Sequence, residues 1–332
     1  MKKNSTNRLM TLNFGRMCVA NFLSFASVYM FLPVLSLVVP ERLGISVPQV
    51  GGMFLAFAAA MFAVGPFHAY LCDEYKRKDV LLCSTLVVLA AMPGYAFADS
   101  YAKLLLLASV QGACFGLATT AGITVAIDIT MSARRSAGNK AYALAARLGM
   151  LAGVCAGCLV YWLYGFRTVA YAAVAVGALG MLSVSRVYVA FRAPIGLGLC
   201  SLDRFLLPRA WLPALNVLLV AFVPGVLFPL LYTGELALFA ALGILALLTI
   251  PFTKMFVKLS HHCQRGTANT TCQLAIETGF LAGLAAACRL SDACLPAPDV
   301  CQLYRLAGAA ALLALLFFVL LTRPYYKRKR VR

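Results

Sequence analysis

The sequence contains ten long apolar runs, each bounded by charged residues or by Gly and Pro. They cover residues 17 to 39, 50 to 71, 80 to 98, 104 to 127, 141 to 163, 168 to 187, 211 to 231, 234 to 257, 272 to 290 and 303 to 322. A helix needs about 20 apolar residues to cross the hydrocarbon core of a bilayer, which is roughly 30 Å thick. Transmembrane strands would instead appear as segments of about ten residues with alternating hydrophobicity. The runs therefore predict an all-α, polytopic transmembrane helical bundle.

The composition excludes a water-soluble globule as the main interpretation. Of the 332 residues, 62% are hydrophobic and only 12% are charged, which is too apolar for a soluble domain. The formal net charge of +18 would suit a nucleic-acid-binding domain, so the meaning of this charge depends on where it lies in the chain.

The basic residues lie almost entirely on one side of the predicted bundle. All but five of the 29 Lys and Arg residues fall on the side that carries both termini. The exceptions are Arg42, Lys103, Arg167, Arg289 and Arg305. Because Lys and Arg concentrate in short cytoplasmic loops, both termini are predicted to be cytoplasmic, in a multi-pass protein of the inner membrane with an even number of spans. This topology and attraction to membrane lipid with anionic headgroups explain the charge, and no nucleic-acid partner is expected.

The longest polar interruption between spans covers residues 188 to 210, on the predicted cytoplasmic side. It predicts a six-span first half at residues 1–190, a central cytoplasmic linker at 191–210, and a four-span second half with a basic tail at 211–332. The other loops are short and leave no room for a soluble catalytic domain. The protein is therefore expected to act within the membrane.

The cysteines and histidines do not form a clear cofactor site. Most of the 12 cysteines lie inside predicted spans, where they serve as small apolar residues. Cys294 and Cys301 share the outer loop and form either a disulfide in an oxidising exterior or a pair of free thiols. His261, His262 and Cys263 have no second ligand pair at structural-zinc spacing. No metal, nucleotide or other cofactor is predicted.

The predicted cytoplasmic loop between the second and third spans carries the clearest motif. Asp73, Arg77 and Lys78 match a Gly-x-x-x-Asp-Arg-x-Gly-Arg-Arg/Lys pattern, although three other positions depart from it. These departures are Ala69, Glu74 and Lys76. The loop resembles the signature loop of the major facilitator superfamily, which lies at the same place in the topology.

Three further elements of that superfamily recur in order. Gln111-Gly112 resembles its Arg-x-x-Gln-Gly element, with Ala108 in place of the arginine. A glycine stripe resembles its antiporter element, with Val154 in place of the proline, and Arg265-Gly266-Thr267-Ala268 followed by Glu277-Thr278-Gly279 resembles the stretch that enters its eleventh helix. The stripe consists of Gly149, Gly153 and Gly157, whose spacing predicts a close approach between helices but does not by itself indicate antiport.

The resemblance implies a latch between the cytoplasmic ends of the two halves. Its residues are Asp73, Arg77, Lys78, Asp128 and Gly266. The Asp73 carboxylate is expected to face the N-terminus of another helix, where peptide dipoles stabilise negative charge, and Arg77 is expected to pair with Asp128. The alternative is a solvated charged loop.

Polar residues inside the spans are candidates for the transport pathway. His68 and Glu277 are predicted to form a pair or share a water, which either carries a proton or bolts the halves together. Arg147 is expected to extend its charge towards the membrane surface. The side chains proposed to line a cavity, with packing between helices as the alternative, are Asn21, Tyr29, Gln111 and Asn216.

The resemblance implies a secondary active transporter that moves a small solute by alternating access, with proton-coupled efflux as the leading hypothesis. One alternative is a transport-incompetent relative that acts as a scaffold or sensor. An intramembrane enzyme is disfavoured because only three His are present and no metal or paired-carboxylate motif occurs.

The number of spans suggests a bacterial member shortened in its second half. The stretch from 211 to 231 passes through one further span directly into Arg265-Gly266, which the family pattern places after its tenth helix. The equivalents of the eighth and ninth helices are thus predicted to be absent, and a second copy or lipid would fill the gap.

Overall fold

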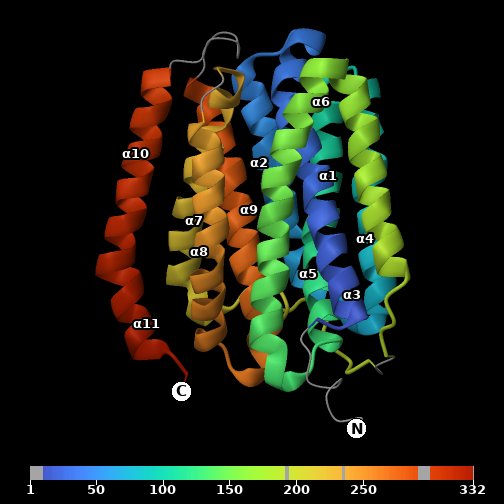
Figure 1. Ribbon diagram of the computed structural model, residues 1–332, viewed down its shortest axis with the longest axis vertical. Coiled ribbons are helices and arrows are strands. Elements are labelled where there is room, and N and C mark those ends of the chain that lie inside the picture. Colours follow the sequence, from blue (N-terminus) through green and yellow to red (C-terminus); the bar gives the residue numbers. More distant parts are fainter. Residues whose placement is uncertain (1–9, 191–193, 234–235, 291–299, 332) are drawn as a thin grey trace.

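The computed structural model describes residues 10–190, 194–233, 236–290 and 300–331, and helices are the only regular secondary structure in these ranges (Figure 1). The first part of the chain forms α1 (Leu12–Leu43), α2 (Val47–Ala63), α3 (His68–Glu74), α4 (Arg77–Phe97), α5 (Tyr101–Asp128) and α6 (Arg135–Ser185). The second part forms α7 (Trp211–Val226), α8 (Ala237–Leu259), α9 (Arg265–Leu290), α10 (Val300–Phe317) and α11 (Arg323–Lys329).

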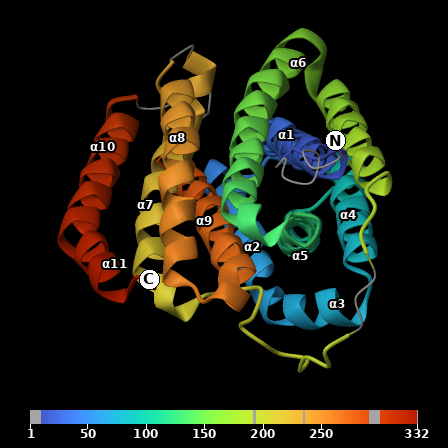
Figure 2. The same cartoon turned by 60° about the horizontal axis from the view of Figure 1, so that its bottom comes forward.

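Nine helical stretches within the described ranges are long and apolar enough to cross a membrane. The longest contains α6, which is broken at Gly165, where φ is 77° and ψ is 179°. The two limbs of α6 run in opposite directions on either side of α1, and they coincide with the separate apolar runs at 141–163 and 168–187 (Figures 1 and 2). The predicted all-α polytopic bundle is confirmed, whereas its division into six and four spans stays a prediction.

Local sequence signals set the ends of the first helices. Thr11 caps α1 by accepting a hydrogen bond on Oγ1 from the Phe14 N–H at 3.2 Å, and α1 ends at Gly44, whose φ is 61°. Ser46 and Gln49 then form a capping box at the start of α2. A sharp turn therefore joins α1 to α2 in only three residues.

Glycines allow one pair of helices in each half to approach closely. In the first half, Gly149, Gly153 and Gly157 on α6 lie directly against α1, where an added Cβ would overlap the carbonyl oxygens of Phe22, Ala26 and Met30. In the second half, Gly279 and Gly283 on α9 lie in the same way against the carbonyl oxygens of Leu218 and Phe222 on α7. In each half, glycines thus allow a later helix, α6 or α9, to pack closely against the first helix, α1 or α7.

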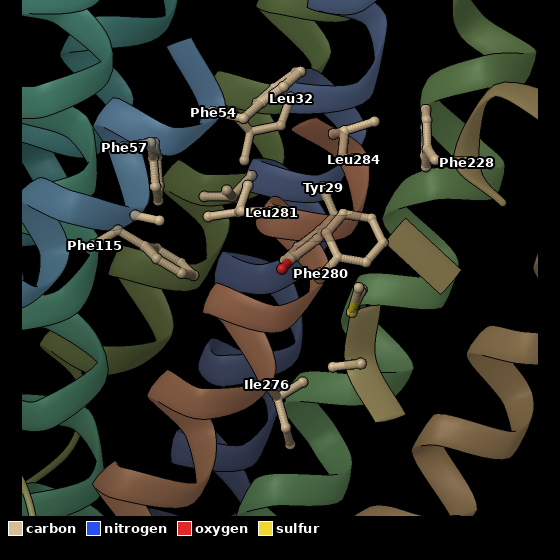
Figure 3. Packing of buried hydrophobic residues seen from close by; sticks show 14 of the residues in the cluster. Tyr29, Leu32, Phe54, Phe57, Phe115, Phe228, Ile276, Phe280, Leu281 and Leu284 are labelled. Atoms are coloured by element: carbon tan, nitrogen blue, oxygen red, sulfur yellow. The ribbon is translucent and has the colours of Figure 1, made fainter. Parts of the chain in front are cut away.

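Contacts between the halves extend over the whole length of the bundle. At one end, Gly51 on α2 packs closely against α9, where an added Cβ would lie 2.9 Å from the Ala285 carbonyl oxygen. At mid-length, the ring of Tyr29 from α1 lies edge-on to Phe280 from α9, with centroids 5.3 Å apart (Figure 3). At the other end, Gly266 at the start of α9 lies beside Ile127 of α5.

The two ends of the bundle differ in charge. The end where α1 begins and α11 ends carries most of the described Lys and Arg residues, and we call it the basic end (Figure 1). The opposite end, where α1 and α9 end, we call the far end.

Candidate functional site

A buried ion pair joins the two halves at mid-length. The Arg147 guanidinium on α6 forms a salt bridge with the Glu277 carboxylate on α9, and both side chains are 1% exposed. Each residue lies twelve positions beyond the first residue of its helix, about 18 Å from the basic end at 1.5 Å per residue. The pair is therefore far from either end of the bundle.

Neutral groups supply further hydrogen bonds to this pair. The Tyr29 hydroxyl on α1 donates to the other Glu277 oxygen, and Arg147 Nη2 donates to Gln273 Oε1 at 2.9 Å. The guanidinium carbon of Arg147 also lies 5.1 Å from the ring centroid of Phe25. Such bonds reduce the free-energy penalty of removing two charges from water. We refer to Tyr29, Arg147, Gln273 and Glu277 as the central cluster.

The position of Arg147 corrects the expectation that its charge reaches the membrane surface. The residue is 2% exposed because α6 begins at Arg135, which places Arg147 more than three turns inside the helix. The side chain is also held between α1 and α9, so it cannot extend along the bundle. The sequence did carry the signal, since an arginine inside an apolar run is a functional candidate by default.

The structure does not bring His68 and Glu277 together. His68 is fully buried at the start of α3, its Nδ1 is hydrogen-bonded to Thr120 Oγ1 of α5 at 2.9 Å, and its Nε2 has no partner among the described residues. The predicted direct pair is wrong because α9 begins at Arg265 rather than at residue 272, so Glu277 lies deeper than the apolar run implied. The carboxylate also faces α1 and α6, whereas His68 faces α5.

At the basic end, the signature loop forms the pair that its residues suggested. The Arg77 guanidinium forms a salt bridge with Asp128, which ends α5. The Lys78 ammonium donates to the carbonyl oxygens of Ser185 at 2.6 Å and Val187 at 2.9 Å. These contacts hold the start of α4 against the ends of α5 and α6.

Asp73 binds the segment between the halves rather than a helix N-terminus. Its Oδ2 accepts hydrogen bonds from the N–H groups of Ile195, Gly196 and Leu197 at 2.8, 3.0 and 3.3 Å. Three successive amides can converge on one oxygen because Gly196 adopts a φ of 77°. The predicted electrostatic role is thus filled by three backbone amides of the linker.

The same segment is attached to the second half through α9. Thr271 Oγ1 accepts from the Leu207 N–H at 2.8 Å, and Thr267 Oγ1 donates to Asp203 at 2.8 Å. Phe205 is 3% exposed and lies 5.7 Å from Phe62 and 5.9 Å from His68 between ring centroids. Residues 195–207, which we call the linker strap, therefore cross the basic end and fill it with an aromatic side chain that sequence reasoning did not identify.

The other candidate residues lie in several environments. Gln111 is fully buried, accepts from the Tyr95 hydroxyl and donates to the Val88 carbonyl, so it ties α5 to α4. Asn21 donates to the Tyr142 carbonyl at 2.8 Å and lines a cavity of about 30 Å³ inside the first half. Asn216 donates to the Ala314 carbonyl at 2.7 Å and lines a separate groove in the second half. Tyr29 alone belongs to the central cluster.

The sequence also raised the questions of a disulfide and of a metal site. Cys294 lies outside the described residues, so its pairing with Cys301 stays untested. Among the residues that the structure describes, no group of three His, Cys, Asp or Glu side chains is placed to hold a metal ion.

The fold and the central cluster define a multi-pass membrane protein whose two helical halves meet around a buried ion pair. The family model described as Major Facilitator Superfamily matches residues 17–194, more than half of the chain. The chain belongs to the major facilitator superfamily, as its signature loop predicted.

Curated relatives match only part of this chain. Over 156 residues, 45% of the chain, it is 30% identical to the multi-drug resistance efflux pump PmrA of Streptococcus pneumoniae, in strains TIGR4 and R6. The match covers 38% of the length of these pumps.

Solved structures share the fold at low sequence identity. The human organic anion transporter MFSD10 (TETRAN) superimposes with a TM-score of 0.58 at 15% identity, over 92% of this chain and 99% of that chain. The nucleoside transporter NupG gives a TM-score of 0.60 at 12% identity, over 93% of this chain and 99% of that chain. These likenesses show the arrangement of helices and nothing about a substrate.

Proposed function

We propose that this protein is a secondary active transporter that moves a small organic solute across the cytoplasmic membrane by alternating access, with proton entry driving efflux. The observation that carries the proposal is the Arg147–Glu277 pair, which lies at mid-length between the halves. The partial match to multi-drug efflux pumps supports the direction and the chemical breadth of the solute. In this account the basic end and both termini face the cytoplasm.

The central cluster supplies a group that can change charge during the cycle. A deprotonated Glu277 attracts Arg147 and holds the halves together, whereas a protonated Glu277 loses this attraction. Arg147 keeps its charge, so water or an approaching solute must then compensate it. Proton entry at the far end would loosen the contact, and proton release at the basic end would restore it.

The linker strap and the signature loop would form the cytoplasmic gate. Asp73, Arg77, Lys78, Asp128 and Gly266 are the proposed gate residues. Opening at the basic end requires Phe205 to leave its position beside Phe62 and His68. The proposed moving bodies are a six-span half at 1–190 and a four-span half at 211–332, joined by the linker at 191–210.

The proposal is tested by flux into proteoliposomes with an acidic interior. The probes are ethidium as a lipophilic cation, uridine as a nucleoside and fluorescein as an organic anion. The wild type is expected to accumulate at least one probe, and a protonophore should abolish the accumulation. Glu277→Gln should lose the dependence on the proton gradient, because the amide cannot release a proton.

Asp99→Asn provides the matched control. Asp99 is an exposed carboxylate paired with Lys103 at 2.7 Å, remote from the central cluster, so this variant should transport like the wild type. Unchanged gradient-driven accumulation by Glu277→Gln would refute proton carriage by this residue. A folded wild type that moves none of the probes would favour a scaffold or sensor.

A further inference from the structure

A continuous groove runs between α8 and α10 from the basic end into the apolar part of the second half. Two cavities of about 470 and 450 Å³ form it, and they share Leu248, Phe252 and Phe318. α7 forms the floor, and α10 stands at the edge of the bundle beside α7 (Figure 1). Nothing in the central cluster or the gate uses this surface.

The part of the groove at the basic end is strongly cationic. Lys254 and Lys258 line one wall at the i and i+4 spacing that places side chains on one face of α8. Arg323, Lys327 and Arg330 line the other wall. The sequence contains no Asp or Glu at 236–276 or 300–332, and none lines the cavity.

Hydrogen bonds from the C-terminal segment fix the shape of this basic pocket. The Val331 N–H donates to the Lys258 carbonyl at 2.8 Å, which closes the groove where α8 ends. The Tyr325 hydroxyl donates to the Arg209 carbonyl at 3.0 Å and fixes α11 beneath α7. These two hydrogen bonds keep Arg323, Lys327 and Arg330 beside Lys254 and Lys258, so that five cations surround one cavity.

The deeper part of the groove is apolar. Its walls come from residues such as Val220 and Pro224 on α7, Ile244 on α8, and Ala311 and Leu315 on α10. Ile244 and Leu315 remain 57% and 58% exposed, so the groove opens towards the surrounding lipid.

The length of the groove matches one leaflet of a bilayer. Ile244 and Lys258 lie fourteen residues apart on α8, which is about 21 Å. Half of a bilayer that measures ~40–45 Å with its headgroups is about the same distance. Charge lies at the level of the headgroups and apolar surface at the level of the acyl chains.

We propose that an anionic diacyl phospholipid occupies this groove, with its phosphate among the five cations and its acyl chains along the apolar walls. The charge complementarity selects an anionic headgroup over a zwitterionic one. A second copy of the chain would bring identical cations together, and a free phosphate would leave the apolar part empty. The lipid would complete the second half on the side where α10 has few neighbours.

The test is a lipid titration of delipidated, detergent-solubilised protein, followed by native mass spectrometry. Phosphatidylglycerol is expected to bind at least about tenfold more tightly than phosphatidylcholine, and glycerol 3-phosphate should not compete at equal concentration. Lys254→Gln/Lys327→Gln should weaken phosphatidylglycerol binding about tenfold, one factor of ten being about 1.4 kcal/mol. Arg328→Gln/Lys329→Gln removes the same charge outside the groove and should bind like the wild type.

A second pair of variants tests the apolar part. Ala311→Trp fills the groove and should weaken phosphatidylglycerol binding, whereas Leu313→Trp, on the exposed face of α10, should not. Equal binding of both lipids, or no loss in the groove variants, would overturn the proposal. Competition by inorganic phosphate with no effect of Ala311→Trp would indicate a free-anion site instead. A wild-type dimer that dissociates in Ala311→Trp would indicate a second copy in the groove.

Discussion

Burying either Arg147 or Glu277 without the other would carry a large free-energy penalty, and their pairing offsets much of it. A buried charge without its partner destabilises a protein by about 3–5 kcal/mol, whereas replacing both partners by apolar residues is often neutral. Their side chains are 1% exposed, and the neighbouring hydrogen bonds come from uncharged groups. Removing one partner is therefore expected to destabilise the protein more than replacing both.

Glu277→Gln is expected to lower the free energy of unfolding in detergent by about 3–5 kcal/mol, because it leaves the Arg147 charge buried and uncompensated. Glu277→Gln combined with Arg147→Met should recover most of this loss. Chemical unfolding of the four members of the double-mutant cycle measures the coupling. Additive effects of the two substitutions would contradict a direct interaction.

At the scale of residues, the sequence identified the buried carboxylate of Glu277 better than it identified its partner. Glu277 was identified because a carboxylate inside an apolar run needs a reason to be there. Its partner was assigned wrongly, because hydropathy places the end of an apolar run but not the start of the helix. α9 also includes the seven polar or small residues at 265–271, so Glu277 lies two turns further from the start of its helix than the apolar run implied.

The glycine stripe sets the distance between α1 and α6, and it can be tested by adding one methyl group. Gly153→Ala would place a Cβ against the Ala26 carbonyl and should destabilise the protein by about 1–3 kcal/mol through overpacking. Gly243→Ala on α8 meets nothing within 4 Å and should be neutral or stabilise by about 0.4–1 kcal/mol. Thermal unfolding of both variants measures the difference, and equal effects would show that the contact is loose.

Asp73→Ala is expected to release the linker strap. Hydrogen bonds to a charged group are worth about 1.5–3 kcal/mol, so amide exchange at residues 195–197 should rise about 10- to 100-fold. Hydrogen–deuterium exchange measures it, and Glu74→Ala, which removes the adjacent exposed carboxylate, should leave the exchange unchanged. Unchanged exchange in Asp73→Ala would show that the strap is held by its other contacts, which include Thr267, Thr271 and the bond from the Ser201 N–H to the Pro66 carbonyl at 2.9 Å.

At the scale of the elements, the apolar runs predicted the membrane-spanning helices, but no sequence feature predicted the linker strap. Residues 195–207 have no periodicity, so nothing local indicates that Phe205 is buried. Their structure comes from long-range bonds to Asp73 on α3 and to Thr267 and Thr271 on α9. Such bonds follow only once the two halves have met.

For the whole molecule, hydropathy and charge distribution predicted the fold class, and sequence motifs at fixed places in the topology predicted the family. The all-α bundle and the superfamily membership follow from spans, sidedness and one loop motif. How the halves meet depends on shape, as in the contact between Gly51 and the Ala285 carbonyl. A glycine in an apolar run does not reveal which backbone it will touch.

Alternating access requires the halves to separate at the far end during each cycle. A Cβ on Gly51 would lie 3.2 Å from the Cys288 Cβ and 2.9 Å from the Ala285 carbonyl oxygen, so a small local shift of α2 away from α9 would relieve the carbonyl contact and bring the two Cβ atoms to the 3.5–4.5 Å that a disulfide spans. Gly51→Cys therefore offers a reversible bond across the two halves. Gly51→Cys/Cys288→Ala has the same substitution without a partner thiol.

The most direct test is gradient-driven probe accumulation by Gly51→Cys proteoliposomes before and after reduction. The account predicts that the oxidised protein is inactive, that dithiothreitol restores its rate, and that Gly51→Cys/Cys288→Ala is insensitive to both treatments. Oxidised protein that carries a verified bridge to Cys288 and still transports at the reduced rate would contradict movement of the halves at the far end.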